Sequence, residues 1–82
     1  MKARTVYIVT DDDSQTVHRT PGGALDRFSR GGWSVVPPAY PDITVPLNQR
    51  NRAPVIHILE AEGYLEFTNG VTRINAAQLY ED

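Results

Sequence analysis

The chain has 82 residues, of which 40% are hydrophobic and 22% charged; these values are ordinary for a globular protein and predict one small domain, residues 1–82. It contains no cysteine, which excludes a disulfide framework and a thiolate metal site. No apolar run reaches the roughly 18 residues of a membrane span or resembles a signal peptide, so we expect a cytoplasmic protein without membrane contact. The formal net charge of −2 argues against a generic binder of polyanions.

The first predicted element is a strand over residues 5–11, TVYIVTD, because apolar residues occupy both of its alternating faces. Turn residues follow, and residues 16–20 can return as an antiparallel partner. The adjacent carboxylates of Asp11, Asp12 and Asp13 could coordinate a hard cation, but the ligand spacing of a calcium loop is missing. We therefore interpret this acidic cluster as a solvated hairpin turn and expect no bound metal.

A short helix is expected next, in the segment TPGGALDRFSRGG. Thr20 is a candidate N-cap, Pro21 suits the first helical position, and Gly31 can adopt the left-handed conformation that ends a helix. Apolar residues at helical spacing predict its buried side. Arg27 and Arg30 lie near its C-terminal end, where the helix dipole favours cations.

A third strand is predicted over residues 33–36, WSVV, and a proline-rich loop follows over residues 37–54. This loop holds five of the six prolines. Proline fixes φ and removes a backbone donor, so we expect little regular structure there apart from an edge strand at DITV. A loop of this length in so small a domain is uncommon unless it binds something or is disordered.

Residues 54–63, PVIHILEAEG, fit a short helix better than a strand. At about 100° per residue, four apolar side chains share one arc of a helix, whereas neither alternating face of a strand would be uniformly apolar. These four are Val55, Ile56, Ile58 and Leu59. We expect Pro54 at the first helical position and Gly63 at the position that ends the helix.

The segment YLEFTNGVTRI, residues 64–74, predicts a β-hairpin in which Asn69 and Gly70 form a type I′ turn, because both residues tolerate a positive φ. This turn places Glu66 opposite Arg73 on a polar face. The opposite face is then apolar and suited to burial. It holds Leu65, Phe67, Thr72 and Ile74.

The last residues, NAAQLYED, are expected to form a helical turn capped by Asn75 or to fray. Together the elements predict an α+β fold, in which two short helices pack on an antiparallel or mixed sheet that ends in a C-terminal β-hairpin. Charge is uneven along this chain. Residues 14–54 have a net charge of +3, from five arginines and two aspartates, and residues 55–82 have a net charge of −4, from one arginine and five acidic residues.

The basic middle of the chain and the tyrosine in its loop predict a surface for protein recognition. Tyrosine and arginine are the residues that dominate many protein interfaces. The expected partner-binding residues are Arg27, Arg30, Tyr40, Arg50 and Arg52. Packing over the sheet is the alternative role for Tyr40. An exposed strand edge offers a second route to a partner, by sheet extension or by formation of a homodimer.

An enzymatic role is not indicated by the two histidines, His18 and His57. Neither has a nucleophile or a further ligand at a spacing typical of a catalytic or metal site. We therefore expect a small non-enzymatic protein-binding module, regulatory or inhibitory, without a cofactor. Short chains of this kind are common among the accessory proteins of phages and mobile elements, which act by binding a host protein or complex.

The segment RAPVIHILEAEGYLEFTNGVTRI, residues 52–74, resembles the second half of winged-helix proteins, in which a helix ends at a glycine and continues into a two-stranded wing. In that family the helix reads the major groove of DNA, and the wing tip touches the DNA backbone or the minor groove. The resemblance implies a nucleic-acid partner as the alternative function. The contacts it implies are Arg50, Arg52, His57, Asn69 and Arg73.

Overall fold

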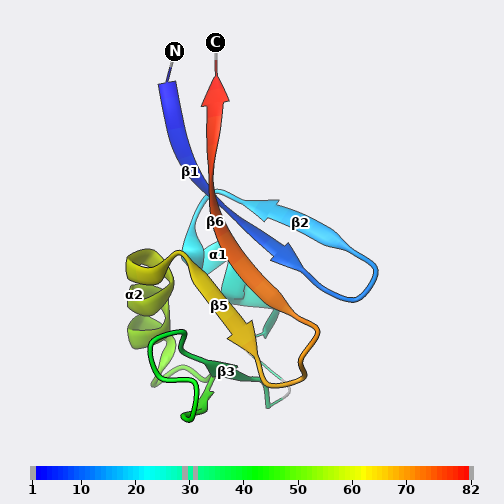
Figure 1. The fold of residues 1–82 in the computed structure, drawn as a ribbon, viewed down its shortest axis with the longest axis vertical. Helices are drawn as coiled ribbons and strands as arrows, with labels where there is room; N and C mark the ends of the chain where they lie inside the picture. The colour runs from blue at the N-terminus through cyan, green and yellow to red at the C-terminus, as the bar shows by residue number, and fades with distance from the viewer. Residues whose placement is uncertain (1, 29, 31, 82) are drawn as a thin grey trace.

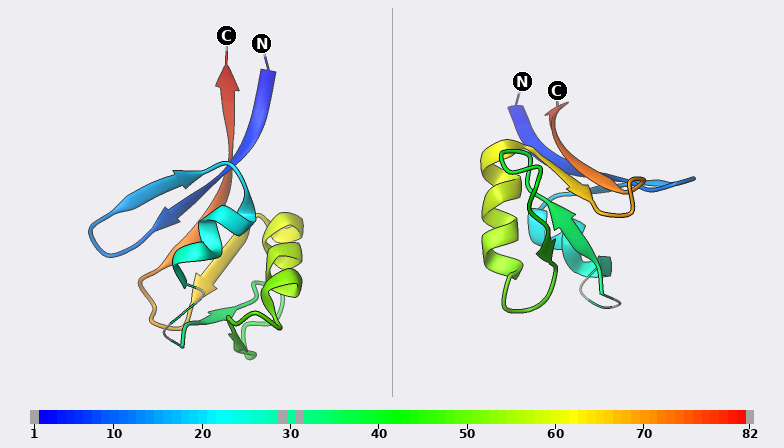
Figure 2. Two further views of the ribbon diagram at one scale, coloured as in Figure 1. Left: turned by 180° about the vertical axis from the view of Figure 1, so that it is seen from behind. Right: turned by 60° about the horizontal axis from the view of Figure 1, so that its bottom comes forward.

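The computed structural model describes residues 2–28, 30 and 32–81. Its strands are β1 (Lys2–Thr10), β2 (Gln15–His18), β3 (Ser34–Val36), β4 (Val45–Pro46), β5 (Tyr64–Phe67) and β6 (Arg73–Glu81). Its helices are α1 (Pro21–Leu25), which continues into the 3₁₀ turn η1 (Asp26–Phe28), and α2 (Arg52–Glu62). The described strands form one antiparallel sheet in the order β2-β1-β6-β5-β3-β4, with both helices on one face (Figure 1, Figure 2). The α+β fold expected from the sequence is therefore confirmed.

The longest pairing in the sheet joins β1 and β6, which lie side by side along their whole lengths. Lys2 lies opposite Glu81 at one end, and Thr10 lies opposite Arg73 at the other. The expectation of a helical turn or a frayed end from Asn75 onward is therefore wrong. Helix propensity is a weak preference, and the long strand β1 offers a partner to the backbone groups that β6 directs toward it.

One end of the β1–β6 pair projects beyond the rest of the sheet (Figure 1). β2 pairs with β1 only from Tyr7 to Thr10, and β5 pairs with β6 only from Arg73 to Asn75. Residues 2–5 and 78–81 therefore form a two-stranded extension, which we call the terminal ribbon.

The core fills the space between the sheet and the two helices. Its buried members come from every layer: Tyr7, Val9, Ala24, Leu25, Phe28, Val35, Leu47, Val55, Leu59, Leu65, Phe67 and Ile74. The ring of Phe28 lies at the middle of an aromatic cluster, with its centroid 4.9 Å from that of Trp33 and 4.5 Å from that of Phe67. Tilted and edge-to-face contacts of this kind add to the stabilisation that burial gives.

Helix α1 begins where the sequence predicts. Thr20 is the N-cap, its Oγ1 accepts a hydrogen bond from the Gly23 N–H at 3.0 Å, and Pro21 is the first helical residue. The capping hydroxyl satisfies one of the backbone donors that have no partner at a helix start. The helix is shorter than expected, since α1 ends at Leu25 and η1 at Phe28, and Arg30 lies in a bend beyond it. Gly31, the predicted final residue, lies outside the described residues.

Helix α2 is also present, although it begins two residues earlier than expected. Asn51 occupies the capping position and Arg52 the first helical position, so Pro54 is third rather than first. A proline is tolerated there because the N–H groups of the first turn have no intrahelical acceptor. Gly63 ends the helix as predicted, with a φ of 71° and an N–H that donates to the Leu59 carbonyl at 2.8 Å.

The C-terminal hairpin has the predicted register, with Glu66 opposite Arg73 on an exposed face. The opposite face is buried against the helices. Its four members have exposed fractions of at most 1%: Leu65, Phe67, Thr72 and Ile74. β3 and β1 flank the two strands of the hairpin, which is therefore part of the interior of the sheet.

The turn of this hairpin differs from the predicted type I′ turn. Gly70 has a φ of 77°, but Asn69 does not have the positive φ that this turn type requires. Instead, Asn69 Oδ1 accepts hydrogen bonds from the N–H groups of Val71 and Thr72, each at 2.9 Å. Asparagine side chains often shape turns in this way, and here the result is a wider turn between β5 and β6.

The loop over residues 37–54 is mostly irregular, as its prolines predict. The expected edge strand at DITV is present only in part, because β4 begins at Val45 and pairs with β3 over two residues. The remainder of the loop contains a series of turns. One of them joins the N–H of Asn51 to the carbonyl of Asn48 at 3.2 Å, directly before α2.

The buried hydroxyl of Thr72 yields a test of the packing. It donates to Asp11 Oδ1 and accepts from Asn69 Nδ2, both at 2.9 Å. Thr72→Val keeps the shape of the side chain but removes both bonds, so it should lower the free energy of unfolding by about 1 kcal/mol, as measured by urea unfolding. Thr68→Val, an exposed position in the same turn, is the control. An equal loss in both variants would contradict a role for the hydroxyl.

Candidate functional site

The loop that follows β3 presents an aromatic side chain to solvent. Tyr40 is 62% exposed, and Ile43 is exposed beside it. Two backbone hydrogen bonds fix this loop: Tyr40 N–H donates to the Pro37 carbonyl at 3.1 Å, and Ile43 N–H donates to the Tyr40 carbonyl at 3.0 Å. Its prolines further restrict the backbone. The sequence leaves two roles open for Tyr40, contact with a partner or packing over the sheet, and this exposure favours contact with a partner.

A cavity of about 230 Å³ lies between this loop and α2. The loop contributes Pro37, Ala39 and Tyr40, and α2 contributes His57, Ile58, Ala61 and Glu62. The wall is apolar along Ile58 and Ala61, and it is polar at His57 and Glu62. We call this cavity, together with Ile43, the Tyr40 surface.

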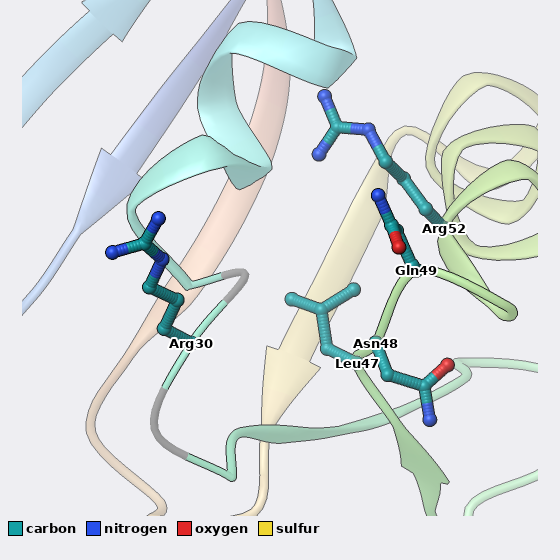
Figure 3. Close-up of a pocket in the computed structure, with 5 residues that line it drawn as sticks. All are labelled: Arg30, Leu47, Asn48, Gln49 and Arg52. Atoms are coloured by element: carbon teal, nitrogen blue, oxygen red, sulfur yellow. The ribbon is translucent and has the colours of Figure 1, made fainter.

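A second cavity, of about 330 Å³, lies at the N-terminal end of α2 (Figure 3). Arg30 reaches it from the connection after η1, and Arg52 reaches it from the start of α2. The segment between β4 and α2 completes the lining with Leu47, Asn48 and Gln49. Two guanidinium groups beside two side-chain amides form a lining that suits a carboxylate or another anion.

Arg52 also has a structural task inside the chain. Its Nη2 lies 2.7 Å from Asp26 Oδ1 and donates to the Gly22 carbonyl at 3.0 Å. These contacts join α2 to α1 and η1. The guanidinium of Arg52 is therefore only partly available to a partner.

Arg27 likewise contacts its own chain. Its Nη2 lies 3.3 Å from Asp11 Oδ2, and its guanidinium carbon lies 5.0 Å above the ring of Phe28. Both are exposed or half-exposed contacts of modest strength. Arg30 and Arg50 are exposed.

The five predicted partner-binding residues do not form one surface. Along a helix of 3.6 residues per turn, the four α2 residues of the Tyr40 surface lie between about 140° (His57) and about 280° (Glu62) around the axis from Arg52. The two cavities are therefore on opposite sides of α2, and they share no lining residue. Tyr40 belongs to one cavity, and Arg30 and Arg52 belong to the other.

The residues implied by the winged-helix resemblance are also spread over the molecule. Arg50, His57 and Arg73 are exposed, whereas the side chains of Arg52 and Asn69 have partners within the chain. The helix and the hairpin of the resemblance are present as α2 and β5–β6. Their nucleic-acid contacts stay predictions.

The acidic turn between β1 and β2 is a hairpin turn, as interpreted, and Asp11 has a role in it that the sequence does not reveal. Asp11 Oδ1 accepts from the N–H of Asp12 and from Thr72 Oγ1, each at 2.9 Å, and Oδ2 contacts Arg27. Asp11 therefore joins three segments, and no local pattern could predict partners so distant in sequence. Among the described residues, no group of three or more side chains is arranged to hold a metal ion.

The same contacts lower the pKa of Asp11 from its ordinary value of 3.8. The largest cause is the hydrogen bond from the Asp12 N–H, the next is the hydroxyl of Thr72, and the Arg27 guanidinium adds to both. Partial burial acts in the opposite direction. All three favourable contacts stabilise the ionised carboxylate.

This lowered pKa predicts how stability depends on pH. The ionised carboxylate stabilises the folded protein fully at pH values above the pKa that Asp11 has in the unfolded state. This stabilisation is lost as the pH falls through the lower pKa that Asp11 has in the folded state. Asp11→Asn should therefore be less stable than the parent at about pH 6 but should lose less stability between about pH 6 and about pH 3, as measured by urea unfolding. Asp13→Asn, in the same turn, is the control. If the stability of Asp11→Asn depended on pH as that of the parent does, ionised Asp11 would not be a source of the stability.

The two arginines that flank Asn51 should differ in their effect on stability. Arg52→Ala removes the contacts to Asp26 and Gly22, so it should lower the free energy of unfolding by about 1 kcal/mol. Arg50→Ala removes an exposed side chain and should change it by less than about 0.5 kcal/mol. Thermal and urea unfolding of both variants measure the difference. Equal changes in the free energy of unfolding would mean that the contacts of Arg52 with Asp26 and Gly22 do not stabilise the fold.

Comparisons of this chain with protein-family models, with curated proteins and with solved structures find no match. None of the helices in residues 2–28, 30 and 32–81 is long and apolar enough to cross a membrane. The function is therefore inferred from the surface of the molecule itself.

Proposed function

We propose that this protein is a small non-enzymatic module that binds a partner protein, with Tyr40 as the central contact. The observation that carries the proposal is the 62% exposed Tyr40 side chain on a loop fixed by two backbone hydrogen bonds. A tyrosine ring buries a large area for the loss of only two torsions. A loop that is already ordered loses little further entropy on binding.

The Tyr40 surface has the composition of a small interface. Ile43, Ile58 and Ala61 supply apolar area near the ring, and His57 and Glu62 supply polar groups around it. An apolar centre with a polar rim is the usual arrangement in protein–protein interfaces. The proposed partner therefore presents an apolar socket that receives the tyrosine ring.

Charge on this side of the molecule favours a basic rim on the partner. Glu62 lines the cavity, and Asp42 is exposed next to Ile43. Arg27 and Arg52 each contact an aspartate within the chain, and neither of them lines this cavity. Complementary charge on a partner would raise the rate of association more than the affinity. By occupying a surface of its partner, such a module acts as a regulator or an inhibitor.

The test is affinity capture followed by a binding titration with the captured protein. Tyr40→Ala should weaken binding at least tenfold, a loss typical of an interface residue that dominates the affinity. The control is Val17→Ala, because Val17 has nearly the same exposure, 63%, in the edge strand β2. Both variants should keep the thermal unfolding midpoint of the parent, since both side chains are exposed.

Two outcomes would contradict the proposal. A partner that binds Tyr40→Ala as tightly as the parent would place the contact surface elsewhere. Binding to a mixed-sequence DNA duplex that weakens steeply with salt would support the nucleic-acid alternative, because such binding releases counterions from the phosphates. In that case Arg73→Ala should weaken DNA binding, and Tyr40→Ala should leave it unchanged.

A further inference from the structure

The terminal ribbon exposes apolar side chains on both of its faces. Leu79 is 46% exposed and Tyr80 is 63% exposed, although they are neighbours in β6 and point to opposite sides of the sheet. Ile74 and Ala76 face the helices, so Tyr80 shares their face and Leu79 lies on the face without helices. The ribbon stands clear of the rest of the molecule in all views (Figure 1, Figure 2).

Backbone hydrogen bonds show which groups of β6 point away from β1. The carbonyl of Thr72 accepts from the Phe67 N–H at 3.0 Å, and the N–H of Ala76 donates to the Gly63 carbonyl at 2.8 Å. Both bonds point to the β5 side. Since this direction alternates along an antiparallel strand, the N–H and C=O groups of Gln78 and Tyr80 point to the same side. Among the described strands, β5 pairs with β6 only as far as Asn75, so these groups lie at an open edge.

This open edge lacks the usual protection against pairing with another strand. Natural proteins protect strand edges with charges, prolines, bulges or a covering loop. The β6 part of the ribbon, QLYE, residues 78–81, contains no proline and a single charged residue, Glu81 at its end. In a pairing centred on Leu79, Glu81 lies opposite Ala77 of the second copy and not opposite another charge. The opposite edge of the ribbon belongs to β1, whose sequence KART contains two basic residues. Two copies of that edge would bring like charges together, which disfavours its self-pairing.

We propose that two copies of the protein form a symmetric dimer by antiparallel pairing of their β6 edges, centred on Leu79. In this register Gln78 of each copy lies opposite Tyr80 of the other copy, and their outward N–H and C=O groups bond to each other. Leu79 then faces its own counterpart in a non-hydrogen-bonded pair, where side chains are closest. The result is a four-stranded ribbon.

A second copy fits this edge because the edge is complementary to itself. Pairing about a two-fold axis through Leu79 gives hydrogen-bond partners to four backbone groups of each copy. It also covers Leu79 on one face of the ribbon and Tyr80 on the other face. A ribbon of two strands is marginal by itself, and further strands stabilise it. The contact is small, so the dimer should be of micromolar affinity. It uses a surface separate from that of Tyr40 and does not depend on the function proposed above.

A proline substitution tests the pairing without touching the bonds to β1. The N–H of Gln78 points outward, so Gln78→Pro removes a donor to the second copy and leaves the β1–β6 ladder intact. Gln78→Ala is the matched control, because it also loses the side-chain bond to Thr5 Oγ1, at 3.1 Å, but keeps the N–H. Sedimentation velocity over micromolar to millimolar concentrations should show dimers for the parent and Gln78→Ala. Dimerisation of Gln78→Pro should be at least tenfold weaker.

A cross-link tests the register, since the chain contains no cysteine. Cα atoms in a non-hydrogen-bonded antiparallel pair lie about 4.5 Å apart, within the range that a disulfide bridges. Leu79→Cys should therefore form a covalent dimer on mild oxidation. Val17→Cys is the control, because Val17 is 63% exposed on the other long edge of the sheet, in β2.

The proposal is overturned if the parent is a monomer at all concentrations, or if Val17→Cys forms the covalent dimer and Leu79→Cys does not. Circular dichroism establishes that each variant is folded. If Gln78→Pro fails to fold, Leu79→Lys replaces it, because two lysines facing each other across the two-fold axis would repel. A Leu79→Lys protein that dimerises as the parent does would equally overturn the proposal.

Discussion

The nine-residue pairing of β1 with β6 is the constraint on which the rest of the structure depends. It places the end of β1 beside the start of β6, so that the turn after β1 and the turn before β6 meet at one end of the sheet. Asp11 and Thr72 can form a hydrogen bond for this reason alone, although they are 61 residues apart. The same pairing gives both hairpins a shared face on which α1 and α2 pack, and its far end extends past every other strand as the terminal ribbon.

Local elements could be predicted from the sequence because their causes are local. The cap at Thr20, the left-handed Gly63 and the burial of one hairpin face each follow from a few neighbouring residues. The strand at residues 73–81, by contrast, forms because of a segment that is distant in sequence, residues 2–10. Its second half contains the helix-favouring residues Ala76, Ala77, Gln78 and Leu79, and it is extended because β1 pairs with it. The shape of the hairpin turn was beyond prediction for a similar reason, since Asn69 and Gly70 are compatible with several turns and a side-chain bond selects one.

The net charge of a sequence segment does not show which of its charged side chains are available to a partner at the surface. The middle of the chain is basic, but two of its arginines contact aspartates of the same chain, at Asp11 and Asp26. Which arginines have an internal partner depends on tertiary contacts, and the positions of Arg52 and Tyr40 on opposite sides of α2 depend on them too. Tyr40, which stands among prolines in the sequence, is exposed in the structure, and its contact with a partner stays a proposal.

The strand order also has a consequence for how the protein is made. The strand nearest the N-terminus of the described chain has as its principal neighbour the strand nearest the C-terminus. On a ribosome, β1 and β2 emerge before the other described strands, and β6, which joins them to the rest of the sheet, emerges after all of them. Until residues 73–81 leave the exit tunnel, the apolar strand β1 has one unpaired edge, which is the kind of surface that aggregates or recruits chaperones. A nascent chain stalled before residue 73 would therefore leave β1 without the strand that completes its sheet.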